Sequence, residues 1–201
     1  MLKKLCSLKG EIVLIVVLSL FLNIKITESP FVVDSNQYLL FSYHLYANNC
    51  FSMDYQYAYT PEKSSIQKNI PAPSHYFEPL VPCVTSFFMR INPLYNPQWS
   101  FQDLQAGYPA KVVKMVNVFW GMVLLLGVYF ASNTLFSYVY LKQSGGKRAC
   151  VSLPLLITLG IWIWLFMTPY IDRLLSEVPA MGLLTFTCLF AFKCVTTLQT
   201  R

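Results

Sequence analysis

A single carboxylate, Asp34, stands where the chain leaves its first apolar segment, directly ahead of an aromatic helical pattern. A carboxylate at such a boundary can take a proton from an attacking hydroxyl, which is the work of a general base. Phe41 and Leu45 recur at helical spacing after it, and the pattern predicts a helix that ends at Asn48. Asp34 with Gln37 three residues later also fits an ordinary N-terminal cap, so both roles stay open.

Three further acids and one arginine lie near predicted membrane boundaries: Glu78, Asp172, Arg173 and Glu177. Such residues can bind a substrate by positioning a cation or a phosphate-bearing lipid. Ordinary roles compete with this interpretation. Asp172 and Arg173 fit a surface ion pair, whereas Glu78 and Glu177 fit the acidic first turn of a helix.

Two histidines, His44 and His75, are too few and too isolated to predict a metal site. We expect His44 on the polar side of its helix, in contact with solvent. The six cysteines contain no C-x-x-C, which argues against zinc or thiol-redox chemistry, and Cys50 and Cys83 can pair in an oxidising compartment. We predict no cofactor, and nothing in the sequence supports a divalent cation.

The elements that must position these residues belong in a membrane. The chain is 55% hydrophobic and only 12% charged, against roughly 25% charged residues in soluble domains. Its net charge of +6 comes from basic residues that are dispersed or flank apolar runs. That placement suits membrane orientation and excludes a nucleic-acid footprint.

The fold we predict is an all-α polytopic membrane protein with about four transmembrane helices and one large outer loop, in a single membrane domain. The apolar runs predict spans at 12–24, 112–141, 150–170 and 178–195, and the outer loop covers 25–111. The first run resembles a signal peptide but lacks a clear cleavage site, so we expect an uncleaved anchor.

The charges predict the orientation of these spans. The N-terminal lysines, the turn at 142–148 and the tail at 193–201 are basic, and four spans put all three on one side. The positive-inside rule makes that side cytoplasmic. We therefore expect a multi-pass protein of the bacterial inner membrane with both termini in the cytoplasm and membrane lipids as neighbours.

The outer loop carries two short helical patterns. One starts near Phe77 and is expected to lie in the membrane interface, with one apolar side formed by Leu80, Val84, Phe87, Phe88 and Ile91. The other follows Ser100, which forms a capping box with Asp103, and is predicted to end at 107–109.

The order of these features resembles one family. The segments DSNQYLLFSYHLYANNCFSMD, SHYFEPLVPCVTSFFMR and TPYIDRLLSEVPAMGLLTF, behind a short first span, look like the N-terminal part of GT-C glycosyltransferases. These polytopic enzymes are related to the protein O-mannosyltransferases and the aminoarabinose transferases. The resemblance implies transfer of a sugar from a polyprenyl-phosphate donor on the outer membrane face.

The resemblance also implies residue roles. Asp34 matches the catalytic acid of the first outer loop, Glu78 lies in the proline-containing segment that closes the loop, and Glu177 matches an acid that opens a later span. The chain departs from the family in two respects. No second acid stands beside Asp34 or two residues after it, where Ser35 and Asn36 occur, and the predicted spans are about half the family's number or fewer. A truncated reading frame, half of a split enzyme completed by a second membrane subunit, and a small relic with another role all stay open.

A different class competes with the transferase. A non-catalytic four-span protein would use the large outer loop to bind a partner. Claudin-like proteins share that topology, but their G-L-W-x-x-C signature is absent from this sequence.

Overall fold

The computed structural model describes the chain apart from residues 1–7, 32, 55–78, 141–152, 174–176 and 200–201. Every regular element within the described ranges is a helix, which confirms the all-α class there. The helices group into two compact units. The apolar-helix unit comprises Met1–Ile24, Val118–Ile171 and Glu177–Arg201. The loop unit comprises Lys25–Asn117 and Asp172–Ser176.

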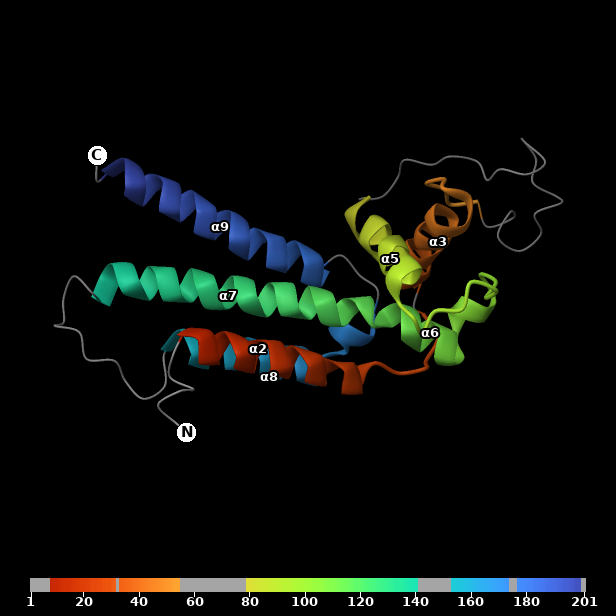
Figure 1. Ribbon diagram of the computed structural model, residues 1–201, viewed down its shortest axis with the longest axis horizontal. Coiled ribbons are helices and arrows are strands. Elements are labelled where there is room, and N and C mark those ends of the chain that lie inside the picture. The colour runs from red at the N-terminus through yellow and green to blue at the C-terminus, as the bar shows by residue number, and fades with distance from the viewer. Residues whose placement is uncertain (1–7, 32, 55–78, 141–152, 174–176, 200–201) are drawn as a thin grey trace. The chain divides into compact units, whose positions relative to one another are not determined.

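Four helices make up most of the apolar-helix unit (Figure 1): α2 (Leu8–Phe21), α7 (Val116–Tyr140), α8 (Leu153–Met167) and α9 (Glu177–Gln199). Helix α2 packs on α8, where Trp162 Nε1 donates a 2.8 Å hydrogen bond to the carbonyl oxygen of Leu18. Helix α2 also meets α7, where the Tyr129 hydroxyl donates to the Glu11 carboxylate and both side chains are buried. These two bonds fix α2 against both neighbours.

Glycines allow α7 and α9 to approach closely. A Cβ atom on Gly127 would lie 2.1 Å from Thr185 Oγ1, and one on Gly182 would lie 3.2 Å from the backbone nitrogen of Leu124. Small residues at a helix crossing let the backbones come together, as is common between membrane helices. A larger residue at Gly127 would separate the two helices.

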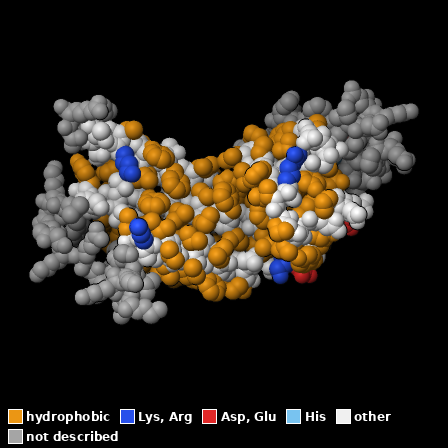
Figure 2. Space-filling model, in the orientation of Figure 1, with side chains coloured by type: hydrophobic (Ala, Val, Ile, Leu, Met, Phe, Trp, Pro, Cys, Tyr) orange, Lys and Arg blue, Asp and Glu red, His pale blue; other side chains and the backbone are white. Residues whose placement is uncertain are grey.

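Two described helices are long and apolar enough to cross a membrane: Gly107–Tyr138 and Glu177–Thr197. They correspond to the predicted spans at 112–141 and 178–195. Much of the α9 surface is apolar and exposed, for example Leu184 at 61% and Phe190 at 62%. Figure 2 shows apolar side chains over much of the visible described surface, with few charged ones.

The other two predicted spans contain shorter helices. Helix α2 has 14 residues and ends at Phe21, where the 3-10 helix η1 (Leu22–Lys25) takes over. Helix α8 has 15 residues within the predicted 150–170 and is followed by η4 (Pro169–Asp172). Residues 150–152 lie outside the described part.

The loop unit holds α3 (Val33–Asn48), α5 (Leu80–Ile91), η3 (Asp103–Gln105) and α6 (Gly107–Lys114). Helix α3 packs against α5, and the predicted end of α3 at Asn48 is confirmed. The chain leaves α3 through Asn49, whose φ of 50° is left-handed, as asparagine tolerates at a helix end.

Helix α3 is buried on more than one side, and this overturns one expectation. His44 was expected in solvent, but it is fully buried. The rings of Phe41 and Phe51 stack at 4.3 Å, and Tyr43 lies 5.6 Å from Phe101. His44 is therefore enclosed by the protein and does not lie on a solvent-exposed side of the helix.

The two short helical patterns of the outer loop are partly confirmed. Helix α5 begins at Leu80 behind Pro79, and the predicted start near Phe77 lies outside the described residues. The Ser100–Asp103 capping box is present, since the Ser100 amide and hydroxyl both donate to Asp103 Oδ2 at 2.7 Å. The helix that follows this box is only the three-residue η3, whose N-cap residue is Gln102. Gly107 opens α6 instead of closing the previous helix, so the predicted end at 107–109 is wrong.

Candidate functional site

The predicted site residues fall in different parts of the structure. Asp34 lies in the first turn of α3, and its side chain is outside the described part. Glu78 also lies outside it. Asp172 and Arg173 belong to the loop unit. Glu177 is the exposed first residue of α9 and belongs to the apolar-helix unit.

The structure brings Asp172 together with three residues that the sequence did not single out: Thr27, Ser29 and Lys114. Lys114 Nζ lies 3.2 Å from Asp172 Oδ1. The Thr27 amide donates to Oδ1 at 2.6 Å, and the Thr27 hydroxyl donates to Oδ2 at 2.7 Å. The Ser29 hydroxyl donates to Oδ2 at 3.0 Å. We call these four residues the anchor cluster; all of them belong to the loop unit.

Lys114 is the buried member of the anchor cluster, with 1% of its side chain exposed. Its ammonium group also donates to the Ser29 carbonyl at 2.9 Å and lies 5.2 Å from the centroid of the Phe31 ring. A buried ammonium requires such partners, because losing water is costly for a charged group. Its donors are engaged inside the protein, so Lys114 connects the segment at Ser29 to Asp172 and is not placed to bind a substrate.

The anchor cluster keeps Asp172 ionised. Partial burial alone would raise the pKa of this carboxyl. The hydrogen bonds from Thr27, the positive charge of Lys114 and the Ser29 hydroxyl outweigh that effect and hold the pKa below its usual value. Asp172 is therefore a carboxylate at neutral pH, bound to its partners.

The ion pair of Asp172 is thus not the one considered from the sequence. Its cation is Lys114, whereas Arg173 is exposed and uses its carbonyl to accept a 2.9 Å bond from Asn117 Nδ2. Local sequence could not reveal this pair, because 58 residues separate Lys114 from Asp172. The available signal was a lysine inside the first turns of an apolar segment, where an ammonium needs an acid from elsewhere.

Two backbone hydrogen bonds also hold the segment that leads from the anchor cluster to Asp34. The Gly107 amide donates to the Glu28 carbonyl at 2.8 Å, and the Phe31 amide donates to the Gln105 carbonyl at 3.2 Å. Residues 27–31 are thus held from both sides. Three residues reach at most about 10 Å, so the backbone of Asp34 starts within that distance of an anchored point.

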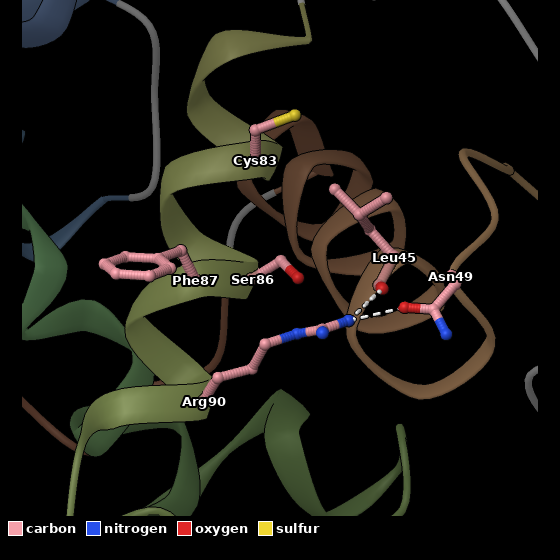
Figure 3. A pocket seen from close by; sticks show the side chains of 6 residues that line it. All are labelled: Leu45, Asn49, Cys83, Ser86, Phe87 and Arg90. Carbon is pink, nitrogen blue, oxygen red and sulfur yellow. Dashed lines mark hydrogen bonds between the residues drawn. The ribbon is translucent and has the colours of Figure 1, made fainter.

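Arg90 of α5 binds the C-terminal end of α3 (Figure 3). Its Nη2 donates to Asn49 Oδ1 at 2.7 Å and to the Leu45 carbonyl at 3.1 Å. The carbonyls at the end of a helix lack partners inside it and carry partial negative charge, so a guanidinium fits there. An open, shallow hollow surrounds this bond, lined by Leu45, Asn49, Cys83, Ser86, Phe87 and Arg90.

His44 occupies a structural position. Its Nε2 lies 3.0 Å from the Asp54 carbonyl oxygen, and its Nδ1 lies 3.2 Å from Asn48 Nδ2. Burial lowers its pKa, although the bond to the Asp54 carbonyl and the Asp54 charge oppose the change. Among the described residues no cluster of three histidine, cysteine or acidic side chains could hold a metal ion. Cys83 is an exposed free thiol, so the described part contains no Cys50–Cys83 disulfide.

Aromatic residues of the loop unit form a connected run near the end of α5. Tyr46 and Tyr95 meet edge to face at 5.0 Å, Tyr95 and Trp99 at 5.3 Å, and Trp99 and Tyr108 at 6.2 Å. These rings pack on one another.

No family model matches this chain, and neither the curated proteins nor the solved structures contain a match.

Proposed function

We propose that this protein is a GT-C-type membrane glycosyltransferase, acting alone or with helices supplied by a second membrane subunit. It transfers a sugar from a polyprenyl-phosphate donor on the outer membrane face. Asp34 takes the proton from the acceptor hydroxyl as that oxygen bonds to the sugar, and the bond from sugar to phosphate breaks. The phosphate leaves on the carrier lipid.

The observation that carries the proposal is the anchored approach to Asp34. A general base must be held within hydrogen-bond reach of the proton it removes. Residues 27–31, which lead to Asp34, are bound to Asp172, Lys114 and the segment at 105–107. This anchoring supports a fixed approach of the chain to α3, which a positioned base requires.

The proposal includes four membrane spans, with both termini in the cytoplasm of a bacterial cell. Helix α2 has 14 residues and α8 has 15, about 21 and 23 Å at 1.5 Å per residue. Both lengths are below the ~30 Å of a bilayer core. A short span is accommodated when the bilayer thins locally, and we propose this for α2 and α8.

The proposed substrate-binding residues on the outer membrane face are Arg173, Glu177 and Glu78. Arg173 is exposed and its guanidinium suits the donor phosphate. Asp172, also predicted from the sequence to bind substrate, is engaged in the anchor cluster, so its proposed role is to hold the site.

The test is sugar transfer by membranes that contain the chain. Such membranes, supplied with a radiolabelled polyprenyl-phosphate sugar, are expected to produce a labelled acceptor, whereas membranes without the chain are not. Absence of transfer by the chain, together with capture of a protein by the outer loop, would favour the non-catalytic partner-binding alternative.

A further inference from the structure

Helix α5 turns its large apolar side chains outward. Phe87 and Ile91 are each 60% exposed, and Leu80 is 42% exposed. Helix α5 packs against α3, and its buried residues are Val81, Pro82, Thr85, Ser86 and Met89. Figure 3 shows the Phe87 ring pointing away from α3 and the Ser86 side chain pointing toward it. Apolar side chains therefore lie on both faces of α5, whereas a surface helix of a soluble protein has charged and polar residues on its outer face.

We propose that the outer leaflet of a phospholipid bilayer covers this face, so that α5 lies in the membrane interface with Leu80, Phe87 and Ile91 among the acyl chains. The 12 residues of α5 span only about 18 Å, which is too short to cross a bilayer core of ~30 Å. Apolar faces of this kind bury about 5–10 Å into the boundary between headgroups and acyl chains.

Three observations favour a bilayer over a protein as the occupant. First, the same loop unit continues without a break into the candidate membrane span Gly107–Tyr138, so the membrane is close by covalent connection. Second, the run of packed rings ends at Tyr108, which is 49% exposed, and tyrosine is enriched at membrane interfaces.

The third observation is the charge at the edge of this face. Arg90 lies between Phe87 and Ile91 in sequence and is exposed. Its bonds to α3 all use Nη2, and within the described residues Nη1 and Nε donate no hydrogen bond. Long basic side chains keep their charge at the headgroups while their stems lie along apolar surface. Nη1 and Nε can therefore donate to lipid phosphate. This docking does not depend on sugar transfer.

The experiment places a spin label at single sites of the full chain in phosphatidylcholine–phosphatidylglycerol vesicles, in a background where the six native cysteines are replaced. The labelled variants are F87C and I91C, with Q98C as the matched control, because Gln98 is exposed in a loop of the same unit. Collision rates with oxygen, which concentrates in lipid, and with a nickel chelate, which stays in water, report the surroundings of each label.

We expect oxygen to collide more often than the nickel chelate at positions 87 and 91, with the reverse ratio at position 98. Nickel access at 87 and 91 equal to that at 98 would overturn the proposal, and so would exclusion of both reagents, because a protein would then cover the face. A second measurement keeps all native cysteines. A photoactivatable benzophenone side chain in place of Phe87 should crosslink to phospholipid, and the same group in place of Gln98 should not; crosslinking of position 87 to protein alone would contradict the docking.

Discussion

Lys114 Nζ lies 3.2 Å from Asp172 Oδ1, joining the end of α6 to the end of η4 within the loop unit. The lysine side chain is almost fully buried, and 21% of the aspartate side chain is exposed. Thr27 and Ser29 complete the anchor cluster from the segment that leads to Asp34.

Replacing Lys114 with methionine should destabilise the loop unit. The substitution keeps most of the side-chain volume but leaves Asp172 half-buried without its cation, so we expect a loss of about 1–3 kcal/mol. The measurement is the free energy of unfolding in mixed micelles. K111M is the matched control on the same helix and should change this value by less than about 0.5 kcal/mol. Equal stability of K114M and wild type would show that the pair contributes nothing.

His44 should make the stability depend on pH. Its pKa in the folded protein is lowered by burial, so below the ordinary value of about 6.5 the unfolded chain binds protons that the folded chain does not. Stability is then full above about pH 6.5 and falls as the pH drops below that value. Unfolding curves between pH 7 and 5 should show this fall in wild type and in H75Q, and a flatter profile in H44Q. A fall of the same size in H44Q would assign the effect to another group.

Arg90 should stabilise α3 through its hydrogen bonds to the C-terminal end of that helix. R90M removes the bonds to Leu45 and Asn49, and we expect a loss of about 1 kcal/mol. R90K should recover only part of it, because one ammonium lacks the planar fork of a guanidinium. R173M is the control, since it removes an exposed arginine from the same unit. Loss of helicity in R90M by circular dichroism, with R173M unchanged, would agree with this role, and equal stability of both variants would exclude it.

The sequence predicted the class and several of the helices but not the contacts between them. Helical periodicity predicted the end of α3 and the apolar side of α5, because both are properties of neighbouring residues. The burial of His44 and the Lys114–Asp172 pair could not be predicted, since each depends on residues far away in the chain. The short 3-10 turns after α2 and α8 were missed for a further reason: composition marks an apolar run without showing where its helix changes type.

The orientation of the spans can be tested with reporter fusions. We expect fusions near Gly145, after Arg201 and after Lys9 to be active in the cytoplasm, and one near Ser64 to be active outside. The basic flanks of the apolar runs are the reason. A cytoplasmic signal at Ser64 would reverse the assignment of sides, and it would place Asp34 on the wrong face for an outer donor.

The role of Asp34 is tested most directly by the rate of sugar transfer in D34N, in membranes that contain equal amounts of folded protein. Asparagine caps a helix nearly as well as aspartate, so the substitution removes the base and keeps the cap. E28Q is the matched control, because Glu28 is an exposed acid on the same anchored segment. We predict that D34N loses at least about 100-fold in rate, the usual contribution of a positioned base, and that E28Q stays within about twofold of wild type. Equal rates for D34N and wild type would contradict the catalytic role of Asp34.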